Sequence, residues 1–145
     1  GDLDGAAREY AADLGRSFGV LQGPNPPRFD LVFLGMGKDG HTASLFPFTD
    51  ALGETRAWVV RNEVPQLDTT RLTFTYPVLN AAWAVLFMVS GHDKADALEQ
   101  VLEGPPNLQQ FPAQGVKPDA GDLIWLVDEA AAGRLHETPA SPPSL

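Results

Sequence analysis

A glycine-rich turn carries the groups in this sequence that are best suited to chemistry. Residues 35–40 spell Gly-Met-Gly-Lys-Asp-Gly, and an imidazole follows at once in His41. Glycines let the backbone approach a ligand closely. A helix beginning near His41 would add free N–H donors and a positive dipole, which help keep an imidazole neutral, as a general base requires. Backbone N–H groups between Gly37 and His41 would stabilise an oxyanion. The turn therefore favours ester chemistry.

Two other interpretations of the turn must be weighed. Its six residues satisfy the pattern G-x-G-x-x-G of dinucleotide-binding proteins, and Glu63 could serve as the ribose-binding acid. That fold needs an unbroken helix after the third glycine, whereas Pro47 and Gly53 interrupt this segment. The simpler alternative is a turn that only reverses the chain and leaves Asp39 and His41 in solvent.

A second loop places a lysine where a cation is unfavourable. Lys94 follows Gly91 and falls in the first turn of a predicted helix, where the helix dipole opposes a positive charge by roughly 0.3–1 kcal/mol. A helix N-terminus after a strand is also a natural anion site. A phosphate bound there would explain the lysine, and the alternative is an exposed side chain in water. His92 is expected to be a solvated loop residue.

The elements that must position these loops alternate between strands and helices. Helices and strands in alternation predict an α/β fold with a mainly parallel sheet flanked by helices. Ligands in such sheets lie at the carboxyl ends of the strands, so residues 35–44 and 90–94 are the two loops expected to carry a ligand site. The near-continuous apolar run 29–34 predicts a strand buried on both faces. The other predicted strands are 58–60, 72–74, 84–89 and 123–127, and the predicted helices are 3–18, a short one around 78–82, one after Gly91 and 129–135.

Composition excludes several classes of protein. The formal net charge is −9 and the ten basic residues are scattered, which argues against a nucleic-acid partner. No stretch approaches the roughly 20 apolar residues that span a bilayer, and no signal peptide opens the chain, so we expect no membrane partner and a cytoplasmic location. The absence of cysteine excludes thiolate chemistry. We expect residues 1–136 to form part of one domain and residues 137–145 to be a disordered tail.

Four segments, in order, resemble 6-phosphogluconolactonases, a family within the glucosamine/galactosamine-6-phosphate isomerase superfamily. They are FDLVFLGMGKDGHTASLFP (29–47), RLTFTYPVLNAA (71–82), GHDKA (91–95) and PDAGDLIWLVDEAA (118–131). The resemblance implies a Rossmann-like fold of the sugar-phosphate isomerase type. It also implies an enzyme without cofactor or metal that hydrolyses 6-phospho-D-glucono-1,5-lactone to 6-phosphogluconate in the pentose phosphate pathway.

The resemblance also implies roles for individual residues. His41 would activate water as the general base, and Asp39 would orient its imidazole or the substrate hydroxyls. Lys94 would contact the substrate phosphate. The remaining residues expected to bind substrate are Gly35, Gly37, Gly40, Thr42 and Arg71; for Arg71 the likeness of its segment is the only support.

Two further possibilities remain open at this point. A glucosamine-6-phosphate deaminase shares the glycine turn, but aligning His41 and Pro47 places Phe46 where that branch has a proton-transferring glutamate. The resemblance also begins well inside the family pattern, so the N-terminal strands of the family have no counterpart. We therefore also consider a non-catalytic fragment that binds sugar phosphate, and we expect self-association or pairing with the missing N-terminal segment.

Overall fold

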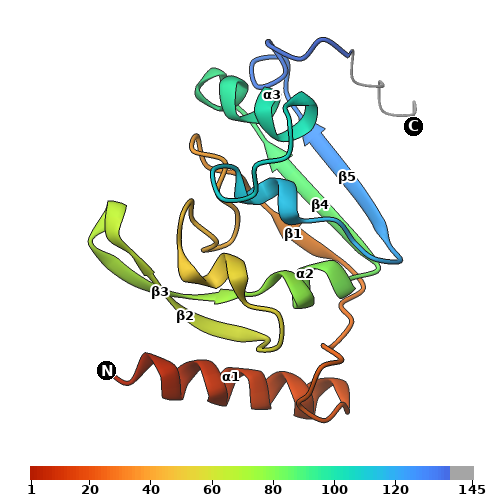
Figure 1. Ribbon diagram of the computed structural model, residues 1–145. Coiled ribbons are helices and arrows are strands. Elements are labelled where there is room, and N and C mark those ends of the chain that lie inside the picture. Colours follow the sequence, from red (N-terminus) through yellow and green to blue (C-terminus); the bar gives the residue numbers. More distant parts are fainter. Residues whose placement is uncertain (138–145) are drawn as a thin grey trace.

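A three-stranded parallel sheet is the centre of the structure, a computed structural model that describes residues 1–137 (Figure 1). Its strands occur in the order β1-β4-β5, and all neighbours are parallel. The mainly parallel sheet predicted from the sequence is confirmed. The helices and strands are α1 (Leu3–Phe18), β1 (Val32–Leu34), β2 (Val59–Val64), β3 (Thr69–Phe74), α2 (Tyr76–Ala81), β4 (Ala84–Val89), α3 (Ala95–Glu103) and β5 (Asp122–Val127), with 3-10 turns at Asp50–Gly53, Pro65–Leu67, His92–Lys94 and Pro112–Gly115.

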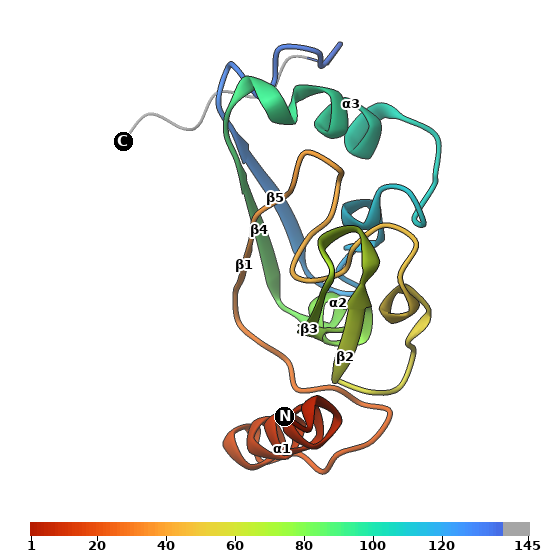
Figure 2. The same ribbon diagram turned by 90° about the vertical axis from the view of Figure 1, so that its left-hand side faces the viewer.

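One face of this sheet carries the main core. The fully buried side chains of Phe87 in β4, Leu79 in α2 and Leu98 in α3 belong to it. Trp125 of β5 stacks on Phe87 with ring centroids 3.9 Å apart. Figure 2 shows α2, α3 and the β2–β3 ribbon all on the same side of the sheet. The apolar residues that point to that side are therefore buried as their strand pattern requires.

The opposite face of the sheet is exposed in the described residues. Val32 and Leu34 are buried, but Phe33 between them is 59% exposed. The prediction that the 29–34 strand is buried on both faces is therefore wrong for this structure. Successive side chains of a strand point to opposite faces, and among residues 1–137 only one face is covered.

A hairpin with a helix across it forms a second packing unit. β2 and β3 pair antiparallel in a two-stranded sheet of their own. The predicted strands 58–60 and 72–74 are thus confirmed as strands, but they do not join the parallel sheet. The helix α1, confirmed with its predicted bounds, buries Ala7, Ala11 and Leu14 against Trp58. Asp2 caps its start, accepting a hydrogen bond from the Gly5 N–H at 2.8 Å.

The predicted helix 129–135 is absent from the structure, and no helix begins near His41. Residues 41–46 form turns with a single bridge between Thr42 and Leu45, because Ala43 adopts a positive φ of 50° and Pro47 follows. Residues 129–135 form turns after Asp128, whose carboxylate accepts a hydrogen bond from the Ala131 N–H. This side-chain hydrogen bond stabilises a turn, and the backbone does not continue into a helix.

The end of the described chain is tied to α3. The Glu103 carboxylate accepts hydrogen bonds from the backbone N–H groups of His136 and Glu137. Glu137, the first residue of the predicted disordered tail 137–145, takes part in this contact, and residues 138–145 lie outside the described residues. Within residues 1–137, no helix combines the length and the apolar character needed to cross a membrane.

Candidate active site

His41 and Asp39 form a hydrogen-bonded pair directly after strand β1. The His41 Nδ1 atom lies 2.6 Å from Asp39 Oδ1, and the His41 backbone N–H donates to the same oxygen at 3.1 Å. The side chains are 29% and 41% exposed, so both can be reached from solvent. The pair holds the imidazole in one orientation and leaves its other nitrogen, Nε2, free.

The charge state of Asp39 fixes the direction of this hydrogen bond. Partial burial acts to raise the pKa of Asp39, but the hydrogen bonds and charge of His41 outweigh it and the net pKa is lowered. An ionised carboxylate only accepts, so we assign the proton to Nδ1 and the free lone pair to Nε2. The pKa of Asp39 in the folded protein is below its ordinary value. The ionised carboxylate therefore contributes its full stabilisation at any pH above that ordinary pKa. This stabilisation is lost as the pH falls through the lowered pKa.

The turn is held by bonds among its own backbone groups. The Gly37 N–H donates to the His41 carbonyl, and the Gly40 N–H donates to the Gly37 carbonyl, each at 2.9 Å. Gly40 has a φ of 80°, which favours glycine. The Thr42 hydroxyl donates to the Gly35 carbonyl at 2.8 Å and is buried. Thr42 therefore closes the turn and does not face solvent.

These internal hydrogen bonds reduce the number of backbone N–H groups that are free to stabilise an oxyanion. The N–H groups of Gly37, Gly40 and His41 already donate within the turn. A free N–H donor from residues 37–41 would therefore come from Lys38 or Asp39. The expected helix dipole at His41 is also absent, because residues 41–46 form turns and no helix starts there. The imidazole is oriented by Asp39 instead.

Phe46 packs against the imidazole. The two rings are stacked with centroids 4.1 Å apart and planes inclined by 19°, and Phe46 is buried. The neighbour of His41 on this side is thus a hydrocarbon ring, which has no acidic or basic group for proton transfer. The turns after Gly40 also leave no helix for a dinucleotide pyrophosphate, which argues against the dinucleotide interpretation.

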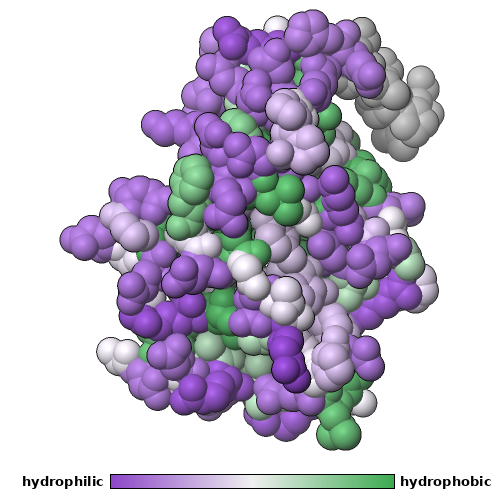
Figure 3. All heavy atoms as spheres, viewed as in Figure 1, coloured by the Kyte–Doolittle hydropathy of each residue, from purple (hydrophilic) through white to green (hydrophobic). Residues whose placement is uncertain are grey.

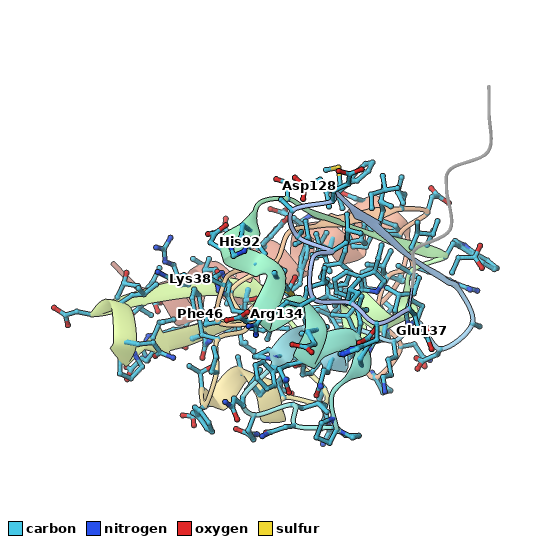
Figure 4. All side chains as sticks on the ribbon, turned by 90° about the horizontal axis from the view of Figure 1, so that it is seen from above. Lys38, Phe46, His92, Asp128, Arg134 and Glu137 are labelled. Atoms are coloured by element: carbon cyan, nitrogen blue, oxygen red, sulfur yellow. The ribbon has the colours of Figure 1, made fainter. Side chains whose placement is uncertain are left out.

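The structure brings the two predicted loops together at one open pocket of about 430 Å³. Lys94, at the N-cap of α3, lines it together with His41. This follows from the topology, because the carboxyl ends of parallel strands lie at the same edge of the sheet. Figure 4 looks onto this edge from above and labels Lys38 and His92 from the two loops. The lining residues are Phe33, Leu34, Gly35, Met36, Gly37, His41, Ala43 and Lys94.

Arg71 and His92 stand apart from this pocket. Arg71 is exposed in β3, opposite Asn62 of β2, and is not among the lining residues. Its role in substrate binding stays a prediction. His92 is exposed, as expected for a solvated loop residue. Among residues 1–137, no group of three or more His, Asp or Glu side chains is arranged to hold a metal ion.

Three supporting residues were not singled out from the sequence. Asp128, directly after β5, accepts hydrogen bonds from the Gly91 N–H with both carboxylate oxygens at 3.1 Å and so fixes the loop that leads to Lys94. Asn62 donates to the Ser44 carbonyl, and the Thr73 hydroxyl accepts from the Ser44 N–H. For Asp128, the available signal was an acid placed directly at the carboxyl end of an apolar strand.

Gly37→Ala should damage the site more than the fold. A Cβ at Gly37 would lie 2.2 Å from His41 Cε1 and 2.8 Å from Asp39 Oδ1, so the imidazole must move. A displacement of about 1 Å at a reacting group can cost about 10²-fold in rate. We expect such a loss in kcat for an ester substrate with little change in the melting temperature. Gly53→Ala is the matched control, because nothing lies within 4 Å of its Cβ position; equal kcat for the two variants would contradict this geometry.

Fold and site together define an α/β protein with an oriented histidine and a lysine at the carboxyl edge of a parallel sheet. The family model described as glucosamine-6-phosphate isomerases/6-phosphogluconolactonase matches residues 1–125. The chain belongs to this family, and the resemblance noted in the sequence is confirmed.

Individual relatives agree with this assignment. The chain is 43% identical to the 6-phosphogluconolactonase of Synechocystis over 93% of its own length, and to the human 6-phosphogluconolactonase over 92%. The solved structure of the Trypanosoma brucei 6-phosphogluconolactonase superposes with a TM-score of 0.80 at 26% identity, covering 92% of this chain. The matched part makes up 55%, 50% and 54% of these three proteins, respectively. The chain thus spans about half the length of the relatives that it matches.

Proposed function

We propose that the protein hydrolyses 6-phospho-D-glucono-1,5-lactone to 6-phosphogluconate, with His41 as the general base. The observation that carries the proposal is the His41–Asp39 pair, with Nδ1 and Oδ1 2.6 Å apart, whose His41 lines a pocket together with Lys94. The relatives named 6-phosphogluconolactonase support the choice of substrate.

The reaction follows from the free Nε2 of His41. A water molecule loses a proton to Nε2 as its oxygen attacks the lactone carbonyl carbon. The carbonyl becomes an oxyanion, which an N–H donor of the turn stabilises. The bond to the ring oxygen then breaks, and the leaving oxygen takes the proton back from Nε2. The products are a carboxylic acid, which ionises, and a hydroxyl group. Asp39 stabilises the transient imidazolium as the acceptor of its Nδ1–H.

Lys94 supplies the charge for the phosphate in this proposal. It is half-buried at the N-cap of a nine-residue helix and forms no ion pair with any of residues 1–137. A phosphate in the pocket would meet both its ammonium group and the N-terminus of α3. Gly35 and Gly37 line the pocket and would let the substrate approach the backbone. Gly40 is buried against Phe111 and does not line the pocket, so it would act, like Thr42, by shaping the turn.

The direct test is hydrolysis of the phosphorylated lactone, followed through the 6-phosphogluconate formed and corrected for the spontaneous reaction. Hydrolysis of the unphosphorylated lactone at the same efficiency would contradict the substrate assignment. The partner expected here is a small sugar-phosphate lactone. A cytoplasmic location, the absence of a nucleic-acid partner, a reaction without cofactor, and residues 1–136 as the C-terminal part of one domain stay predictions.

Glucosamine-6-phosphate deamination is the second candidate, and Phe46 argues against it. Amine loss with isomerisation requires acid–base groups that lactone hydrolysis does not, and the ring stacked on His41 is a hydrocarbon. We expect no ammonia release from glucosamine 6-phosphate above the level of a His41→Ala control. The measurement is a coupled ammonia assay beside the lactonase assay, and comparable rates for both substrates would reverse the choice.

A further inference from the structure

The loop after β4 that carries Lys94 has no capping side chain of its own. Gly91 opens the loop with a φ of 98°, and the Lys94 N–H donates to the Gly91 carbonyl at 3.1 Å. Neither the 3-10 turn His92–Lys94 nor the helix α3 that follows it has a side-chain hydrogen bond at its N-cap. Such a bond normally fixes the start of a helix. The position of Lys94 therefore depends on contacts from other parts of the chain.

Asp128, at the end of the neighbouring strand β5, supplies such a contact. Both of its carboxylate oxygens accept from the Gly91 N–H at 3.1 Å, and one of them also accepts from the N–H of the fully buried Ala131 at 2.8 Å. Figure 4 labels Asp128 and His92, which lie on the two segments that this carboxylate joins. Hydrogen bonds to an ionised carboxylate are stronger than those between neutral groups. Within residues 1–137, no other side chain is hydrogen-bonded to the backbone of residues 90–94.

The segment after β5 contacts α3 through polar groups. In Figure 3 the upper part of the molecule, where α3 and this segment lie, is mostly hydrophilic. Arg134 pairs with Asp96 of α3 at 2.9 Å, and His136 pairs with Glu103 at 2.8 Å. These pairs hold the helix itself, whereas Asp128 bonds the loop that precedes it. Asp128 is therefore the residue of this segment that acts directly on the Lys94 loop.

We propose that Asp128 is a positioning residue for the substrate phosphate and acts through Gly91 on Lys94. The inference rests on the proposed function, in which Lys94 binds that phosphate. Lys94 lines the pocket and Asp128 does not, so Asp128 acts without touching the substrate. Loss of its carboxylate releases the Gly91 N–H and lets the loop move. Phosphate binding is then weakened, while the His41–Asp39 pair stays in place on its own turn.

Steady-state kinetics of Asp128→Ala on the phosphorylated and the unphosphorylated lactone tests the proposal. We expect the Michaelis constant for the phosphorylated lactone to rise about three- to tenfold, the effect of one hydrogen bond. The value of kcat, and both constants for the unphosphorylated lactone, should change little. Asp128→Asn keeps one acceptor oxygen but loses the charge, so it should give a smaller rise in the same constant. Asp122→Ala is the matched control, because Asp122 is exposed at the opposite end of β5.

The same substitution in a Lys94→Ala background separates positioning from general damage. Residues that act through one another are not additive, so Asp128→Ala should cause no further rise in the Michaelis constant once Lys94 is absent. Fully additive effects of the two substitutions would overturn the proposal. Equal losses on both lactones, or an equal rise for Asp122→Ala, would do the same. Circular dichroism verifies that each variant folds, and Asp128→Asn carries the test if Asp128→Ala does not.

Hydrogen exchange without substrate distinguishes a failure of this inference from a failure of the proposed function. Asp128→Ala should speed exchange of the backbone N–H groups of residues 90–94 and leave the β2–β3 hairpin unchanged. Unchanged exchange in residues 90–94 would refute the inference whatever the activity. An unmodified chain that does not hydrolyse the lactone contradicts the proposed function alone. The affinity for inorganic phosphate then decides the inference: Asp128→Ala should lower it about three- to tenfold and Asp122→Ala should not, and equal affinities of the two variants would refute it.

Discussion

Replacing His41 with alanine should lower kcat for lactone hydrolysis by about 10²–10⁴-fold, the usual contribution of a positioned general base. The expected loss rests on the oriented imidazole, whose Nδ1 is held by Asp39 and whose Nε2 is free. The Michaelis constant should change little, because the base acts mainly in the transition state. The measurement is steady-state hydrolysis of the lactone by the chain itself.

His92→Ala is the matched control for this prediction. His92 lies close by in sequence to Lys94, is exposed, and does not line the pocket, so its removal should leave kcat nearly unchanged. The Asp39→Asn variant is a second test of the base assignment. It keeps the size of the side chain and removes the charge that stabilises the imidazolium. Turnover of His41→Ala close to that of the unmodified protein, after subtraction of spontaneous hydrolysis, would refute the base assignment.

Replacing Lys94 with alanine should raise the Michaelis constant for the phosphorylated lactone by about 10- to 150-fold. This range corresponds to the loss of one charge-assisted hydrogen bond of about 1.5–3 kcal/mol. For the lactone without phosphate, the same substitution should have a much smaller effect on kcat/KM, because the lost interaction involves only the phosphate. Steady-state kinetics on both substrates measures the difference.

Lys38→Ala controls for the general loss of a positive charge near the site. Lys38 belongs to the same glycine turn but is exposed and does not line the pocket. We expect its removal to change the Michaelis constant by less than about threefold, in keeping with the small effect of an exposed charge. Equal losses on both lactones for Lys94→Ala would show that this lysine does not bind phosphate.

The sequence alone determined the local elements that carry the chemistry. The 84–89 strand has the bounds predicted from its apolar run, and α1 has those predicted from its periodicity. The resemblance to the family implied that Asp39 orients either the His41 imidazole or the substrate hydroxyls, and the structure has Asp39 hydrogen-bonded to the imidazole. Parallel topology singled out residues 35–44 and 90–94 as the candidate ligand loops, and in the structure His41 and Lys94 from these loops line one pocket.

Tertiary structure decided what depends on contacts distant in sequence. No local pattern predicted that Asp128 would hold Gly91, 37 residues away, or that Asn62 would hold the Ser44 carbonyl. No helix begins at His41, because the Thr42 side-chain hydrogen bond and a positive φ at Ala43 give the backbone a competing turn. The exposure of Phe33 could not be predicted from the sequence for a similar reason. An apolar strand indicates that both faces should be buried, but only the packed structure shows which face the described residues cover and which they leave exposed.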